Sequence, residues 1–246
     1  MAFFREAKPA REPFLTAPAS VLGLIAVILA AHVARTLIPE TLSDRILETY
    51  AFIPARYAAA AWAAQGGSPV SIWDGVVPFV SYMFLHADFL HVGVNCLWLL
   101  VAGTPVARRL GTLRFFTLFL VCGVLAAAAY LAVNWGLYGA AIGASGAVSG
   151  MMGAAIRIYY GDSMALPAAN TVIPRLAPLF SMPILFFSAV WCVANVVAGI
   201  TGLGTAGNVQ AVAWEAHLGG YFAGLFLVGP FDAWRRGRST PNGAPH

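Results

Sequence analysis

Residues 143–160, GASGAVSGMMGAAIRIYY, form the stretch from which we infer the fold. Its length approaches that of a membrane-crossing helix, which needs about 20 mainly apolar residues. Small residues recur at every fourth position, namely at Gly146, Gly150 and Ala154. The same spacing returns in a later apolar stretch, at Ala216, Gly220 and Gly224. Because small residues let two helix backbones approach closely, we expect these two stretches to pack against each other.

The composition of the whole chain is that of a membrane protein. Of its 246 residues, 60% are hydrophobic and only 10% are charged, whereas a soluble domain has about 25% charged residues. The mean hydropathy is +0.77. The basic residues lie in small clusters between apolar runs and do not form one face, so we do not expect nucleic-acid binding.

Six apolar stretches are long enough to cross a bilayer: 19–38, 82–103, 113–134, 143–160, 178–202 and 211–229. Lys and Arg gather in the two terminal tails and in the connectors after the second and fourth stretches. Such residues mark the cytoplasmic side of a membrane protein, so both termini are expected to be cytoplasmic. The sequence therefore predicts an all-α membrane protein, with one domain over 1–246 and a bundle of six transmembrane helices.

The first outer loop, 39–81, is too long to be a simple connector. It mixes acidic residues with large apolar ones, among them Leu42, Tyr50, Trp62 and Trp73. This mixture favours short helices that lie in the membrane interface.

We expect no metal, cofactor or disulfide. The three cysteines, Cys96, Cys122 and Cys192, lie in apolar stretches without the CxxC spacing of metal or redox sites. His86 and His91, with Asp88 between them, do not share one helix face, because positions i and i+5 point about 140° apart.

Polar side chains at one depth point to a functional site, because such residues are costly inside a membrane. The depth of each side chain in the membrane follows from its number of residues from the expected helix end, at about 1.5 Å per residue. Pro78 and the polar residues His86–Asp88 indicate that the buried part of the second helix begins nearer 87 than 82. Ser145, His217 and the pair His91 and Asn95 then all lie about 6–12 Å below the outer surface. Three expected helices thus bring these side chains to one level.

These residue types suit nucleophilic acyl transfer. A serine hydroxyl becomes a good nucleophile when a base takes its proton, and His217 is the histidine on a neighbouring stretch that can do so. Ser145 at a helix N-terminus has unbonded backbone N–H groups nearby. His91 and Asn95, four residues apart on one helix face, can add side-chain donors for the oxyanion that forms.

The motifs around these residues resemble those of the rhomboid family of intramembrane serine proteases. They are GASG at 143–146, AHLGG at 216–220 completed by Gly224, and HVGVN at 91–95 preceded by FLH at 84–86; the resemblance covers about 76–229. It implies that Ser145 is the nucleophile and His217 the general base and acid, a dyad without an acidic third member. It also implies an oxyanion hole of His91, Asn95 and the Ser145 N–H. Backbone access and helix packing would rest on Gly143, Gly146, Gly220 and Gly224.

The resemblance further implies a substrate gate in the fifth helix and the last outer loop, here Phe187, Trp191 and Gly202–Gly207. Two features depart from the family pattern. We find no Trp-Arg pair in the outer loop, and Ala107 stands where an acidic residue often follows the second helix. These departures concern loop geometry and substrate presentation more than catalysis.

Two further polar residues lie within the last two expected helices. Asn195 is expected to hold helices together instead of contacting a ligand. Glu215 lies two positions before His217, about 200° away on a helix, and should not orient its imidazole.

The expected function is hydrolysis of peptide bonds in or near the transmembrane segments of membrane-protein substrates. The expected place is a bacterial inner membrane, with the active site open to the outer side and no nucleic-acid partner. Two alternatives remain open at this point: a transporter that uses the polar cluster as a pathway, and a non-catalytic binder or chaperone of membrane proteins. The transporter hypothesis lacks inverted repeats and a charged path.

Overall fold

The computed structural model describes residues 17–161, 175–202 and 213–237, and the regular structure in these residues is helical. Each predicted apolar stretch overlaps one long helix. These helices are α1 (Ala19–Thr36), α6 (Phe89–Leu110), α7 (Thr112–Val133), α8 (Ser145–Tyr159), α9 (Met182–Thr201) and α10 (Trp214–Gly237). The prediction of an all-α chain is therefore confirmed.

Four helices in the described residues, α1, α6, α7 and α9, are long and apolar enough to cross a membrane. The other two long helices lie outside this set. α8 has 15 residues and α10 has 24. α8 is shorter than the predicted 143–160 at its start, because Gly143 has a φ of 115°, which a helix does not contain.

The helix of the second stretch, 82–103, begins close to the position near 87 that the polar residues indicate, but it ends seven residues later than predicted. Residues Tyr82–Phe84 form a separate short helix, η2, and α6 begins at Phe89. Asp88 sets this start, because its carboxylate accepts a hydrogen bond from the N–H of His91 at 2.7 Å. α6 then continues to Leu110 and ends at Gly111, whose φ is 79°. A hydropathy pattern does not register such caps.

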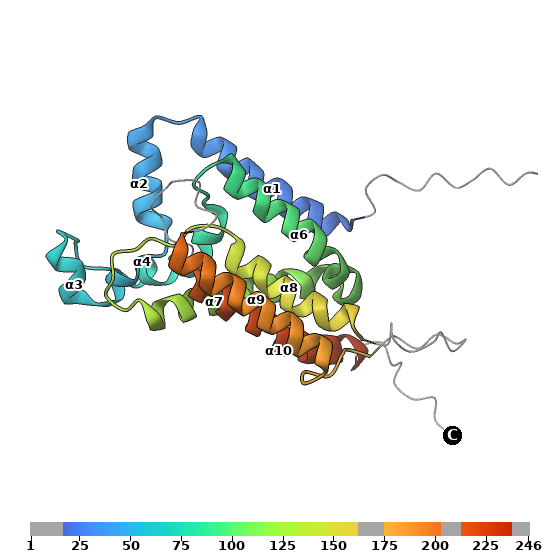
Figure 1. Ribbon diagram of the computed structural model, residues 1–246. Helices are drawn as coiled ribbons and strands as arrows, with labels where there is room; N and C mark the ends of the chain where they lie inside the picture. The colour runs from blue at the N-terminus through green and yellow to red at the C-terminus, as the bar shows by residue number, and fades with distance from the viewer. Residues whose placement is uncertain (1–16, 162–174, 203–212, 238–246) are drawn as a thin grey trace, which may run out of the picture.

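The outer loop folds into short helices, as its composition predicts. They are α2 (Glu40–Tyr50), η1 (Pro54–Tyr57), α3 (Ala59–Ala64), α4 (Ile72–Val76) and α5 (Pro78–Ser81). Figure 1 shows α2, α3 and α4 gathered at one end of the long helices. A β-bridge between Phe52 and Ala141 joins this loop to the segment just before α8.

The core of the bundle is α8, which packs mainly against α10 and also contacts α6 and α7. Ten of its 15 residues are buried. Glycine makes the packing against α10 possible: a Cβ on Gly220 would collide with the carbonyl oxygen of Gly146, and one on Gly224 with that of Gly150. The predicted contact between the two small-residue stripes is confirmed.

A buried ion pair joins α6 to α10 at the other end of the bundle. The Nε of Arg109 donates to Oδ1 of Asp232, and its Nη2 donates to Oδ2, each at 2.9 Å. Such a two-pronged contact fixes the relative position of both helices. Ala107, which replaces the acidic residue of the family pattern, is buried on the same helix. The acidic partner of Arg109, near the end of α6, is therefore Asp232 of α10.

Gly224→Ala should destabilise the bundle, because the new methyl group collides with the Gly150 carbonyl and forces α8 and α10 apart. Overpacking a tight core costs on the order of 1–3 kcal/mol. The measurement is the free energy of unfolding of the detergent-solubilised protein. Gly23→Ala in α1 is the matched control, because a methyl group there meets nothing within 4 Å. Equal stability of the two variants would contradict the close packing.

Candidate active site

Ser145 is the first residue of α8 and follows a segment that hydrogen bonds from other parts of the chain hold in place. Hydrogen bonds from other parts of the chain hold that segment, among them Ala141 N–H to Phe52 O at 2.8 Å, Gly143 N–H to Tyr82 O at 2.9 Å, and Ala144 N–H to His86 Nε2 at 3.3 Å. Ser145, the candidate nucleophile, therefore follows a turn whose position these hydrogen bonds fix. The N–H groups of the first helical turn have no carbonyl partner within the helix.

His217 lies in the first turn of α10 and faces Ser145 directly. Its Nε2 is 2.8 Å from the Ser145 Oγ, a hydrogen-bond distance. Both side chains are partly exposed, so the pair is not sealed inside the bundle. The contact depends on the close approach of α8 and α10, because Gly220, one turn after His217, lies against the carbonyl of Gly146.

Asn195 of α9 completes a chain of three side chains, which the sequence did not predict. Its Oδ1 is 2.8 Å from the other imidazole nitrogen, Nδ1 of His217. Its Nδ2 donates to the carbonyl of Trp191 at 2.9 Å. Asn195 does link two helices, as expected, but through the imidazole itself. The available signal was a strongly polar side chain within an apolar helix.

Glu215 points elsewhere, as the sequence predicts. Its Oε1 accepts a hydrogen bond from Nδ2 of Asn134, at the end of α7, at 3.2 Å. The carboxylate thus ties α7 to α10 and leaves the imidazole of His217 to Asn195.

His91 lies against the turn that precedes Ser145. Its Nδ1 is 3.4 Å from the N–H of Ala87 and can accept from it, which leaves the proton on Nε2. A Cβ on Gly143 would be 2.7 Å from that Nε2, so only glycine leaves room for the ring. The φ of Gly143, 115°, also disfavours any other residue.

Asn95 follows His91 by one turn of α6 and is buried. One N–H of its amide donates to the carbonyl of His91 at 2.9 Å. The second N–H of the Asn95 amide is not used in this hydrogen bond, so it can donate to another group.

His86 is a structural member of the site, a role that its place in the FLH motif did not specify. It is fully buried, and its Nε2 accepts the Ala144 N–H, one residue before Ser145. Among the described residues, no group of three or more His, Cys, Asp or Glu side chains could hold a metal ion.

The two predicted gate residues, Phe187 and Trp191, pack on Tyr221 of α10. Their ring centroids lie 6.3 and 6.0 Å from that of Tyr221, in near-parallel orientation. Ser188 adds a hydrogen bond of 2.9 Å to the Tyr221 hydroxyl. Gly202 follows α9, and the remainder of the predicted gate segment, 203–207, lies outside the described residues.

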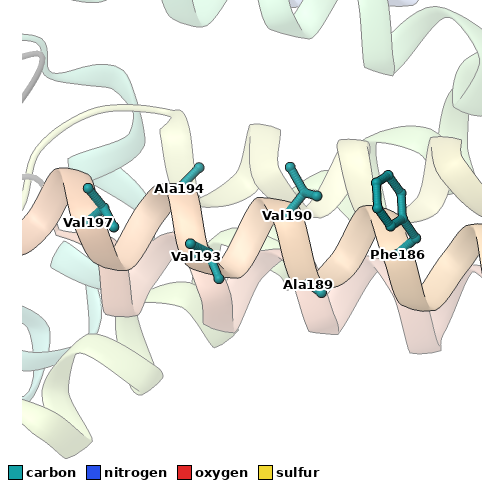
Figure 2. Close-up of a pocket in the computed structure, with 6 residues that line it drawn as sticks. All are labelled: Phe186, Ala189, Val190, Val193, Ala194 and Val197. Atoms are coloured by element: carbon teal, nitrogen blue, oxygen red, sulfur yellow. The ribbon is translucent and has the colours of Figure 1, made fainter.

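A shallow apolar groove runs along α9, and it does not include the Ser145–His217 pair. Figure 2 shows its lining, which is Phe186, Ala189, Val190, Val193, Ala194 and Val197. All six belong to one helix, so the groove is a surface of α9. A surface of this kind suits lipid or another apolar helix.

The outer loop contains an arginine–tryptophan contact, although the two residues are not adjacent in sequence. Arg56 lies over the ring of Trp62, 5.3 Å from its centroid. The Arg56 guanidinium also donates to the carbonyls of Thr49 and Ala51. One buried arginine thus fastens the end of α2 to α3.

Comparison with known proteins agrees with the motifs. The Rhomboid domain family model matches residues 72–231. Rhomboid protease GlpG of Serratia proteamaculans (strain 568) is 27% identical over 167 residues, which are 68% of this chain and 51% of that relative. Rhomboid protease GlpG of Yersinia pestis (strain Pestoides F) is 26% identical over 168 residues, with the same shares. The chain therefore spans about half the length of the curated relatives it matches. Since the family model covers more than half of the chain, this protein belongs to the rhomboid family.

Proposed function

We propose that this chain is an intramembrane serine endopeptidase that cleaves membrane proteins in or near their transmembrane segments. The observation that carries the proposal is the 2.8 Å contact between Ser145 Oγ and His217 Nε2 within an apolar helical bundle. The names of its relatives, which are rhomboid proteases, support it. A transporter or a chaperone would not require a serine and a histidine in this geometry, so neither alternative is favoured.

The chemistry follows from the positions of the two side chains. His217 Nε2 takes the hydroxyl proton as Ser145 Oγ attacks the scissile carbonyl carbon. When the tetrahedral intermediate collapses, the imidazolium gives that proton to the leaving amine. Water then attacks the acyl-enzyme in the same way, His217 accepts the water proton, and the serine hydroxyl is regenerated. No cofactor is required.

The oxyanion of this intermediate would meet donors on two helices. The Ser145 N–H belongs to the first turn of α8, where backbone N–H groups and the helix dipole both favour negative charge. The Nε2–H of His91 reaches the adjacent turn at Gly143. Asn95, one turn further along α6, adds the amide N–H that its bond to His91 leaves available.

We further propose that all six long helices cross the membrane as a single domain with both termini cytoplasmic. The supporting observation is an asymmetry of charge. In the outer loop the acidic residues Glu40, Asp44, Glu48 and Asp74 outnumber the basic residues Arg45 and Arg56, whereas basic residues close the opposite ends of α6 and α8, at Arg108 and Arg157. By the positive-inside rule, the site would open to the outer face of a bacterial inner membrane.

Substrate access is proposed to pass α9. Phe187 and Trp191 would act as the gate, because their contact with Tyr221 holds this largely exposed helix against α10. The partners of the enzyme would be transmembrane segments that reach it through the bilayer.

Ser145→Ala or His217→Ala should abolish proteolysis while the protein stays folded, because the two residues act as a unit. The double variant should be little worse than either single one. Cleavage of a transmembrane substrate is the measurement, together with covalent labelling by a serine-directed phosphonate. Ser149→Ala, one turn along α8, is the matched control and should still be labelled. Cleavage or labelling that survives in Ser145→Ala would reject the mechanism.

Asn95→Ala should lower turnover, because the oxyanion loses one donor. Such a loss typically costs on the order of 10²–10³ in kcat. KM should stay close to its original value, since the donor acts on a charge that exists only after attack. Steady-state kinetics with one substrate measure both constants. A variant that raises KM and keeps kcat would show that Asn95 only packs.

A substrate helix that is easily unwound should be cut faster. In a regular helix the carbonyl groups are hydrogen-bonded and shielded by side chains, so Ser145 can attack only after local unwinding. Glycine weakens a helix interior by about 1 kcal/mol relative to alanine, and proline by about 3. We expect Gly or Pro in the outer half of a substrate's transmembrane segment to raise the cleavage rate, and a Leu/Ala-rich segment to resist. Equal rates for both versions of one substrate would refute this account.

A further inference from the structure

We propose that Asn195 is a positioning residue for His217, so that the catalytic unit comprises Ser145, His217 and Asn195. The proposal rests on the proposed function and deepens it. It assigns a role to a neutral amide on α9, a helix that neither the nucleophile nor the base belongs to.

The hydrogen-bond pattern of Asn195 fixes which way its amide faces. Its Nδ2 donates to the carbonyl of Trp191, four residues earlier in α9. A carbonyl oxygen accepts only, so the amide nitrogen must point there and Oδ1 must point to His217. The reversed amide would set two oxygens against each other. The 2.8 Å contact with Nδ1 is therefore one in which Asn195 accepts.

This acceptor selects the tautomer of the imidazole. Nδ1 must carry the proton that it donates to Asn195, so Nε2 of the neutral ring has a free lone pair. That lone pair faces the Ser145 hydroxyl at 2.8 Å. The opposite tautomer would present an N–H to the serine and could not take its proton. Asn195 thus holds His217 in the form in which it is a base.

The same contact limits rotation of the ring. After His217 accepts the serine proton, its Nδ1–H still donates to the Asn195 carbonyl group, whose dipole has its negative end toward the imidazolium. The ring therefore keeps its plane between attack and proton delivery to the leaving amine.

Burial supports a specific role for Asn195. Of the 20 residues of α9, only Ile184 and Asn195 are buried. A second side-chain hydrogen bond between α9 and α10 joins Ser188 to Tyr221 and does not involve His217. Ser188→Ala thus offers a control that removes one hydrogen bond between α9 and α10 and leaves the hydrogen bond of the imidazole in place.

The test compares Asn195→Leu, Asn195→Asp and Ser188→Ala in the full-length protein. Leucine matches asparagine in size but cannot accept a hydrogen bond. We expect its kcat to fall about 10–100-fold, the range seen when the partner that orients a metal-binding histidine is removed, with KM little changed. Phosphonate labelling of Ser145 should slow in proportion. Asn195→Asp restores an acceptor and should bring kcat back to within a few fold of the original value. Ser188→Ala should keep kcat.

Three results would overturn the proposal: full turnover in Asn195→Leu, a change confined to KM, or an equal loss of kcat in Ser188→Ala. A measurement on the unaltered protein covers the case in which the leucine variant does not fold. Nitrogen NMR of ¹⁵N-histidine-labelled protein, with His217 assigned by its absence in His217→Ala, should show the proton on Nδ1. A proton on Nε2 would refute the proposal. Failure of the proposed function is distinct, because then the unaltered protein would not be labelled at Ser145 at all.

Discussion

The close contact between α8 and α10 is the constraint on which the rest of this molecule depends. Two glycines of α10 lie against two carbonyl groups of α8, at a separation that no side chain would allow. In a membrane the hydrophobic effect does not drive helices together, because the lipid tails are as apolar as the side chains. Close van der Waals packing is therefore a main source of helix association. The contact also sets the chemistry, because Gly146 and Gly220 flank the Ser145–His217 pair and hold it at hydrogen-bond distance.

The helices that make up the site differ greatly in how firmly they are held. α8 is mostly buried, and its start is braced by hydrogen bonds from the outer loop and from His86. α9, in contrast, leaves nearly all of its side chains at the surface. Ser145, the proposed nucleophile, therefore lies on the most buried helix of the bundle, while the hydrogen-bond acceptor for the His217 imidazole comes from the most exposed. Any displacement of α9 from α10 must break the contact between Asn195 and His217.

Sequence patterns predicted the parts of this fold that depend on periodicity. The long apolar stretches, the small-residue stripes, and the meeting of Ser145 with His217 all follow from spacing and depth along single helices. The start of α6 near 87 followed from polar residues and not from hydropathy, and the Asp88 cap accounts for it. The end of α6 at Leu110 did not follow from the apolar stretch. The contact of Arg56 with Trp62 was also hidden, since it joins residues six positions apart through an irregular loop. Asn195 could be recognised as unusual, but its partner depends on how α9 is rotated, which no pattern within α9 determines.

The amide at this position suits the environment. An ionised carboxylate beside His217 would be a stronger acceptor, but a charge taken out of water costs several kcal/mol unless it is fully compensated. The neutral imidazole of a resting enzyme provides no such compensation. An amide carries no charge, and here its nitrogen and its oxygen each have a partner, the Trp191 carbonyl and the Nδ1–H of His217. In the proposed mechanism, asparagine would therefore orient His217 without adding charge to an apolar bundle.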